Sequence, residues 1–249
     1  MRQREFEVNV GKKAYITYLC NDNFIPGAIA LIKSAQHFEI KEPFVCMITE
    51  DVTEEGREIL LKNGFSDLPV VDKIVPERID GIKDRYKGNS WMMYTKLNLW
   101  SLYQYEKLVF LDADCLIVSP GVNMVEMPAV SAVKDIGYGG ISAGVLVLEP
   151  NEEIFNDMLV EINNPEYDNT YSDQSFLDWY LKKNSMWNEI PLHYNTLQKR
   201  LQLVHESKVY HYNGQKPWIT DQANSCHWQQ GDTNEYNAWM HFYNLREKE

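Results

Sequence analysis

Apolar runs of strand length alternate with amphipathic segments through the first half of the chain. The apolar runs lie at residues 14–19, 44–49, 70–75 and 107–111. Residues 25–38 and 91–103 have the spacing of apolar side chains that an amphipathic helix requires, and Thr53 and Gly64 are the start and stop signals of another helix. This alternation predicts an α/β fold with a doubly wound, mostly parallel sheet, in which ligands bind beyond the carboxyl ends of the strands.

The pattern changes in the second half. Strands are predicted there at residues 129–133, 142–148 and 208–211. Helices are predicted at residues 151–163, 173–183 and 234–247, the last of them packing on the surface. The chain contains no internal repeat and no linker-like segment, so we predict one domain.

Composition narrows the class of protein. The chain has 249 residues, of which 44% are hydrophobic and 24% charged, an ordinary globular composition. The formal net charge of −12 argues against a nucleic-acid binder, because phosphate backbones attract basic surfaces. An acidic protein that binds a diphosphate has to neutralise it locally, with a metal ion or a few placed cations. No apolar run approaches the roughly 20 residues of a membrane span, and the N-terminus has no signal-like apolar region, so a cytoplasmic protein is expected.

The cysteines indicate no zinc site. They are widely spaced, without a CxxC pair or a Cys/His cluster: Cys20, Cys46, Cys115 and Cys226. Buried free thiols in a reducing compartment are the expected state.

A pair of aspartates, Asp112 and Asp114, directly follows the apolar run 107–111. Residues i and i+2 of an extended segment project to the same side, and small Ala113 separates them. Two carboxylates at a strand end suit a hard divalent cation, Mg²⁺ or Mn²⁺, which diphosphate oxygens can also ligate. A polar turn after a strand is the alternative interpretation, because the motif is short.

Further ordered blocks accompany this pair. They are residues 14–17 with Asn21-Asp22 and Gly27; Tyr94-Thr95-Lys96-Leu97 with Trp100; Phe110-Leu111; Ser142-Ala143-Gly144-Val145; Glu149-Pro150-Asn151; Asp173-Gln174; residues 191–195; and residues 211–218. On these blocks, the sequence from about residue 14 to about residue 220 resembles glycosyltransferase family 8, the retaining enzymes of GT-A fold that include glycogenin and galactinol synthase. The Glu-Pro-Asn block and the aromatic stretch 239–243 are more similar to galactinol synthase.

The resemblance implies a fold and a reaction. The fold would be a single GT-A (Rossmann-like) α/β domain over residues 1–249, with a mostly parallel central sheet flanked by helices. A nucleotide-binding half would span about residues 10–118, a donor-sugar and acceptor half about 119–220, and a helical extension about 221–249. The reaction would move a hexose, glucose or galactose, from a UDP-sugar to a hydroxyl of a small polyol, sugar or glycan, with retention by same-face attack and with Mn²⁺ (or Mg²⁺). A homodimer is left open.

The resemblance also implies roles for individual residues. The matched metal ligands are Asp112, Asp114 and His211, with Ala113 between the carboxylates. The matched uridine and diphosphate positions are Leu19, Asn21, Phe24, Gly214 and Lys216, and the donor-sugar positions are Lys96, Asp135, Ser142, Ala143 and Gly144. Lys87, or else Arg85, would cover the donor from a mobile segment at 77–90. Asp173 and Gln174 match the reacting face of the sugar, with Lys216 acting on the leaving group.

Several of these residues have a simpler interpretation. A lone His211 is more often structural, Asn21 can cap a helix, and Lys96 on an amphipathic helix is usually a solvated charge. Asp173 can be the N-terminal carboxylate of a helix that has Ser172 as its N-cap.

Two departures from the family bear on function. The stretch beyond Asn195, where glycogenin carries its own glucosylated tyrosine, includes residues 201–203 with the sequence Leu-Gln-Leu, so a self-glycosylating primer is the weaker alternative. Ser142 stands where the family usually has asparagine, which leaves the donor sugar open. A sugar nucleotidyltransferase would need a Gly-rich basic loop after the first strand, and residues 20–23 do not form one. A non-catalytic UDP-sugar-binding protein would have no reason to keep both aspartates together with His211 and Lys216.

Overall fold

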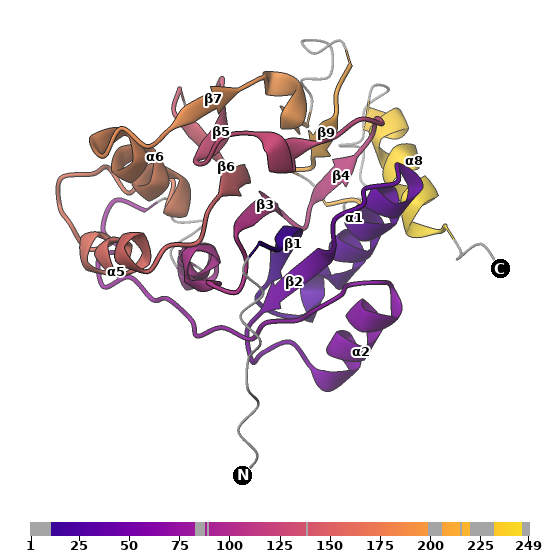
Figure 1. The fold of residues 1–249 in the computed structure, drawn as a ribbon, viewed down its shortest axis with the longest axis horizontal. Helices are drawn as coiled ribbons and strands as arrows, with labels where there is room; N and C mark the ends of the chain where they lie inside the picture. The colour runs from indigo at the N-terminus through magenta and orange to yellow at the C-terminus, as the bar shows by residue number, and fades with distance from the viewer. Residues whose placement is uncertain are drawn as a thin grey trace.

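A six-stranded sheet runs through the centre of the computed structural model (Figure 1). The structure describes residues 11–82, 88, 90–137, 139–198, 206–214, 216–219 and 232–245. The strand order is β2-β1-β3-β6-β5-β7. The strands are β1 (Lys13–Leu19), β2 (Phe44–Ile48), β3 (Lys107–Leu111), β5 (Ser131–Lys134), β6 (Ile141–Leu148) and β7 (Asn188–Ile190). β6 alone among them runs against its neighbours, so the prediction of a mostly parallel sheet is confirmed.

Helices cover both faces of this sheet (Figure 1). One face packs against α1 (Ile25–His37) and α2 (Glu54–Lys62), and the other packs against α4 (Ser90–Tyr94), η2 (Thr95–Ser101), α5 (Glu152–Glu161) and α6 (Asp173–Lys183). Short 3₁₀-helices complete the connections: η1 (Asp22–Phe24), η3 (Met124–Glu126) and η4 (Leu192–Tyr194). The central strands are therefore buried on both faces, which explains why β3 and β6 are apolar almost throughout.

The helix signals of the first half act as predicted. Pro26 lies in the first turn of α1, where a missing N–H costs nothing. The Thr53 hydroxyl accepts a hydrogen bond from the Gly56 N–H, so Thr53 caps α2. The predicted helix at 91–103 is instead split, because α4 continues into the 3₁₀-helix η2 at Thr95.

The strand predicted at residues 70–75 is wrong. Val70 forms one isolated bridge to Ile48 of β2, and the chain then leaves the sheet edge. The N–H of Val71 donates to Ile48, but the N–H of Ile74 donates to the Thr95 hydroxyl instead of a strand. The apolar run ends up at the edge of the molecule, and Val70 and Val75 are 55% and 64% exposed.

A second, three-stranded sheet has the order β4-β9-β8. Its strands are β4 (Cys115–Ile117), β8 (Thr196–Leu197) and β9 (Val209–His211). β4 and β9 are antiparallel, with Cys115 opposite His211. This register brings the carboxyl end of β9 beside the turn that follows β3.

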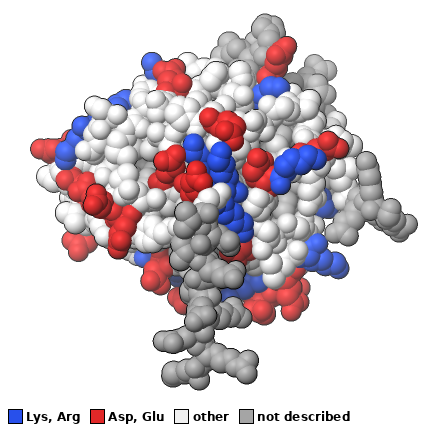
Figure 2. Space-filling model, viewed as in Figure 1, with Lys and Arg blue, Asp and Glu red and all other residues white. Residues whose placement is uncertain are grey.

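The C-terminal helix α8 (Asp232–Tyr243) packs against α1 at the right of Figure 1. The Lys33 side chain donates to the Tyr243 carbonyl at 3.0 Å, and the Phe242 ring lies 5.4 Å from that of His37. The prediction of a C-terminal surface helix is therefore confirmed over the part that the structure describes. None of the helices described combines the length and apolarity that crossing a membrane would require. On the face shown in Figure 2, acidic and basic side chains are interspersed.

Candidate active site

The carboxylate pair lies in the turn between β3 and β4. The Asp112 N–H donates to the Gly144 carbonyl on β6, and the Cys115 N–H closes the turn by donating to the Asp112 carbonyl. The Asp112 side chain is 27% exposed, whereas that of Asp114 is 10% exposed. Both aspartates thus lie at the carboxyl end of a parallel strand, where ligands of open α/β sheets bind.

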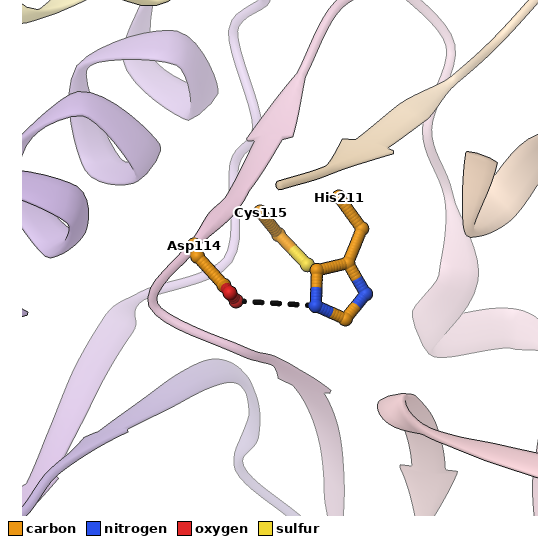
Figure 3. A group of neighbouring side chains, drawn as sticks. All are labelled: Asp114, Cys115 and His211. Carbon is orange, nitrogen blue, oxygen red and sulfur yellow. Dashed lines mark ion pairs between the residues drawn. The ribbon is translucent and has the colours of Figure 1, made fainter. Parts of the chain in front are cut away.

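His211 meets this pair from the end of β9. Its Nε2 lies 3.2 Å from Asp114 Oδ1 and 3.8 Å from Asp112 Oδ2. Figure 3 shows the Asp114 contact, with the Cys115 side chain beside the imidazole. The thiol of Cys115 is free and buried, as predicted for the cysteines, and its pKa is raised by burial and by the two aspartates.

Gly144 makes room for the imidazole. A Cβ at this position would collide with Cε1 of His211, lie 2.7 Å from its Nδ1 and lie 3.0 Å from Asp112 Oδ2. β6 can therefore pass this close to the carboxylate and the histidine because residue 144 has no side chain.

Lys96 lies inside the site, and the interpretation of it as a solvated charge is wrong. The residue is 6% exposed on η2. Its Nζ lies 3.0 Å from Asp112 Oδ1 and 3.1 Å from Asp173 Oδ2 and donates to the Ala143 carbonyl. Burial opposes the charge of Lys96, but the two carboxylates raise its pKa above the ordinary value.

Lys216 contacts Asp114, the other member of the carboxylate pair. Its Nζ forms an ion pair with Asp114 Oδ2 and donates to the Tyr212 carbonyl at 2.6 Å. Burial alone would raise the pKa of Asp114, yet the charge of Lys216 and the contact with His211 hold that pKa well below its ordinary value. Asp114 therefore stays ionised beside the Lys216 ammonium.

Trp218 anchors the segment that carries Lys216. Its indole N–H donates to the Asn23 carbonyl at 3.0 Å, and its ring lies 5.5 Å from Phe24 and 5.6 Å from Trp239. The same ring limits residue 27, because a Cβ on Gly27 would lie 2.7 Å from the Trp218 ring. Gly214 is also closely approached, since its N–H donates to the Gln198 side chain at 3.2 Å.

The loop predicted to hold uridine has its own internal bonds. Asn21 accepts from the Asn23 N–H and caps η1, as its simpler interpretation predicted. Leu19 as a whole is buried at 1% exposure, and its carbonyl accepts a hydrogen bond from the Thr49 N–H. Phe24 lies partly exposed beside Trp218.

Two of the residues assigned to the donor sugar, Asp135 and Ala143, lie beside Gln174. Its Nε2 lies 3.4 Å from Asp135 Oδ2, and its Oε1 lies 3.5 Å from the Ala143 N–H. The Asp173 carboxylate is 7% exposed and pairs with Lys96, and burial raises its pKa despite that lysine. Ser142, by contrast, bonds to Asn195 rather than to this group.

Ser172 does not cap α6 in the expected way. It occupies the N-cap position, but its side chain forms no capping hydrogen bond. Its φ of +57° is unusual for a residue with a side chain, and the residue is fully buried next to Asp173.

The sequence predicts further site residues, but the contacts described above join one group of them: Asp112, Asp114, His211, Lys96, Asp173 and Lys216. Lys87 and its alternative Arg85 lie outside the described residues, as do Cys226 and residues 201–203. The sequence analysis gave no role to Asn195, whose side-chain oxygen Oδ1 lies 3.0 Å from His211 Nδ1. The block of residues 191–195 can be recognised in the sequence, but the contact of Asn195 with His211 depends on how η4 and β9 lie in space.

The chain is similar to known sugar-transferring proteins. A family model described as "Glycosyl transferase family 8" matches residues 15–129. Glycogenin-1 of Caenorhabditis elegans is 30% identical, over 72% of this chain and 41% of that protein. Galactinol synthase 6 of Arabidopsis thaliana is also 30% identical, over 85% of this chain and 75% of that protein. UDP-glucuronate:xylan alpha-glucuronosyltransferase 1 of the same plant is 28% identical, over 88% of this chain and 34% of that protein. The chain thus spans less than half of two of these relatives.

Solved structures share the fold. The galactosyltransferase LgtC, crystallised with donor and acceptor sugar analogs, superposes with a TM-score of 0.66 at 17% identity, over 94% of this chain and 98% of that one. The bifunctional protein WbbM superposes with a TM-score of 0.68 at 16% identity, over 96% of this chain and 50% of that one.

Proposed function

The chain belongs to glycosyltransferase family 8 and has the GT-A fold, and we propose that it transfers a hexose from a UDP-sugar to a hydroxyl acceptor with retention of configuration. The observation that carries this proposal is the convergence of Asp112, Asp114 and His211 beyond the end of β3. Cationic side chains flank this group on both sides, as an acidic protein needs in order to bind a diphosphate.

These residues fit a divalent metal ion. Two carboxylates and one imidazole nitrogen form the donor set, and the missing side chain of Gly144 gives the imidazole room beside the carboxylates. Mg²⁺ prefers oxygen ligands throughout, whereas Mn²⁺ accepts imidazole, so Mn²⁺ suits the set better. When bound, the ion supplies positive charge that neutralises the diphosphate.

Lys216 is proposed to act on the leaving group. Its ammonium already lies against Asp114, close to where the diphosphate would meet the carboxylate pair. A positive charge at this position stabilises the negative charge that develops on departing UDP. Such electrostatic stabilisation usually lowers an enzyme's activation barrier more than any other single effect.

The surroundings of the reacting face favour same-face attack. A covalent intermediate needs a free nucleophile, but Asp173 is buried in an ion pair with Lys96, and the Gln174 amide is a poor nucleophile. In same-face attack, the bond from the anomeric carbon to the phosphate oxygen breaks as the acceptor oxygen bonds to that carbon. The acceptor proton passes to the departing phosphate oxygen. The sugar carries oxocarbenium character in between.

Glucose or galactose is the proposed donor sugar, and a small polyol, sugar or glycan is the proposed acceptor. Asp135 and Gln174 offer a carboxylate and an amide that can bind sugar hydroxyls. The galactinol synthases among the relatives have a name that supports glucose or galactose as the donor sugar. The relatives also include glucuronosyltransferases, so UDP-glucuronate is the competing donor to test. We further propose that the whole chain acts as one catalytic unit.

A donor screen tests the function. UDP release is measured with Mn²⁺ over UDP-glucose, UDP-galactose, UDP-xylose, UDP-N-acetylglucosamine and UDP-glucuronate, for the wild type and for Asp114→Asn. Asp157→Asn is the matched control, since Asp157 lies on α5 and accepts from Tyr180. We expect release from a hexose donor, lost in Asp114→Asn and kept in the control. The proposal fails if no donor releases UDP and Asp114→Asn changes neither Mn²⁺ nor UDP affinity. Intact mass spectrometry should show no attached hexose.

A further inference from the structure

The second nitrogen of His211 has a buried partner on the side away from the aspartates. His211 Nδ1 lies 3.0 Å from Asn195 Oδ1, and Asn195 Nδ2 donates to the Ser142 hydroxyl at 2.8 Å. Asn195 is 1% exposed and Ser142 is 3% exposed. Water therefore does not replace either partner easily.

We propose that Asn195 is a positioning residue that keeps the His211 proton on Nδ1, so that the lone pair of Nε2 faces Asp112 and Asp114. The inference rests on the proposed function, in which Asp112, Asp114 and His211 hold the metal ion. It assigns control of metal affinity to a side chain that does not itself touch the ion.

The imidazole needs such a partner because of what lies on its other side. A neutral imidazole carries one N–H, and the nitrogen that carries it cannot ligate a metal. The carboxylate of Asp114, 3.2 Å from Nε2, is a strong acceptor that favours the proton on that nitrogen. An acceptor at Nδ1 favours the opposite tautomer, which is the one that can bind the ion.

The surroundings also fix the plane of the ring. Gly144 passes so close that a Cβ there would lie 2.7 Å from Nδ1, so the imidazole has little room to turn. The backbone N–H of Asn195 donates to the Leu192 carbonyl, which ties the residue to η4. The Asn195 amide thus acts from a fixed position.

The orientation of that amide is the decisive point. If the amide were reversed, its NH₂ would face Nδ1 and hold the proton on Nε2, the tautomer that cannot bind metal. Asn195→Asp separates the two arrangements, because a carboxylate can accept from Nδ1–H but cannot donate. The Ser142 hydroxyl can donate to the new carboxylate, so this variant keeps both contacts.

The first experiment measures Mn²⁺ affinity by the electron paramagnetic resonance of free Mn²⁺. The variants are Asn195→Ala and Asn195→Asp, with Asn151→Ala as the matched control. Asn151 caps α5 by accepting from the Ile154 N–H, so its truncation removes a comparable hydrogen bond far from the site. We expect Asn195→Ala to weaken Mn²⁺ binding by about 10–100-fold. Asn195→Asp and the control should bind Mn²⁺ nearly as the wild type does.

The second experiment reads the tautomer directly. Long-range ¹H–¹⁵N spectra of the histidine-labelled, metal-free wild type should show Nδ1 of His211 as the protonated nitrogen, because no metal ion then dictates the tautomer. A proton on Nε2 would overturn the inference. Two results of the first experiment would also overturn it: Asn195→Ala leaves Mn²⁺ affinity unchanged, or Asn195→Asp lowers Mn²⁺ affinity as much as Asn195→Ala does. A wild type that binds no Mn²⁺ contradicts the proposed function instead. The spectrum needs no variant, so the test survives if Asn195→Ala does not fold.

Discussion

Two lysines contact the carboxylate pair, and their surroundings differ. Lys96 reaches Asp112 from η2, inside the fold, where it also pairs with Asp173 of α6. Lys216 reaches Asp114 from the segment after β9, where Trp218 anchors the chain to the loop after β1. The Lys96 side chain is 8% exposed and the Lys216 side chain is 15% exposed.

The balance of charge differs between the two sides. At Lys96, one cation lies between two carboxylates from different elements, so its charge joins β3 to α6. At Asp114, one carboxylate lies between Lys216 and His211, and its pKa is lowered accordingly. A divalent ion beside Asp114 would add positive charge to that side and push Lys216 towards a bound diphosphate. We therefore expect Lys96 to serve mainly stability and Lys216 mainly turnover.

Lys96→Met is expected to have the largest effect on stability. It leaves Asp112 and Asp173 close together without their shared counterion, and removing one partner of a buried pair costs about 3–5 kcal/mol. Because the Asp112 side chain is partly exposed, we expect a loss of unfolding free energy near the lower end of that range. Urea unfolding measures the free energy of unfolding, and Lys182→Met on the surface of α6 is the matched control. A loss below about 1 kcal/mol would show that Lys96 is not a structural counterion, since surface changes usually stay within that range.

Lys216→Ala should have its main effect on rate. Removing one group that stabilises developing negative charge lowers kcat by about 10²–10³-fold. Asp114 keeps His211 at 3.2 Å, so the loss in unfolding free energy should be about 1.5–3 kcal/mol, the range for a hydrogen bond to a charged group. Steady-state UDP release and urea unfolding measure the two effects. Lys208→Ala, which loses bonds to Ser119 and Pro120, is the control. If kcat stays unchanged while stability falls, the two lysines have the same role.

The contrast between the two sides also shows what the sequence can predict. The place of Asp112 and Asp114 at the end of β3 follows from a local rule, because the apolar run ends there. The extended i, i+2 geometry expected for them does not apply, because they lie in a turn that the Cys115 N–H closes. The environment of Lys96 does not follow from local rules, because its buried charge is paired with Asp173, which lies on another element. The helical pattern around Lys96 indicated a solvated charge, and the structure contradicts that interpretation.

Long-range pairing explains the other differences. His211 and Lys216 were found from ordered sequence blocks rather than from periodicity, and the register of β4 with β9 places them beside Asp114. Asn195 lay in such a block without a role, since its contact with Nδ1 depends on that second sheet. The apolar run at 70–75 failed as a strand because its backbone turns away to Thr95, which the run itself does not encode.

Trp218→Ala tests whether the anchor on the Lys216 side positions the donor. The change removes the ring contacts with Phe24 and Trp239 and the bond to Asn23. Aromatic pairs contribute about 0.5–1.5 kcal/mol each, so we expect KM for the UDP-sugar to rise about tenfold. Trp218→Phe should recover part of the loss, because it keeps the ring and loses the indole N–H. An unchanged KM in Trp218→Ala would mean that the segment holds Lys216 without this anchor.

Ser142→Ala should produce the smallest effect. It tests whether Ser142 acts on Mn²⁺ affinity, through Asn195 and His211, or on the choice of donor sugar. The substitution removes the hydroxyl that Asn195 Nδ2 donates to, but it leaves Oδ1 facing His211. One net hydrogen bond is worth about 1 kcal/mol, so Mn²⁺ affinity should weaken by roughly fivefold at most. Ser66→Ala, which loses a bond to the Phe44 carbonyl at the far edge of the sheet, is the matched control. Ser142 bonds to Asn195 and not to Gln174 or Asp135, so the preference among donor sugars should stay the same. A changed donor preference at unchanged Mn²⁺ affinity would instead place Ser142 at the sugar.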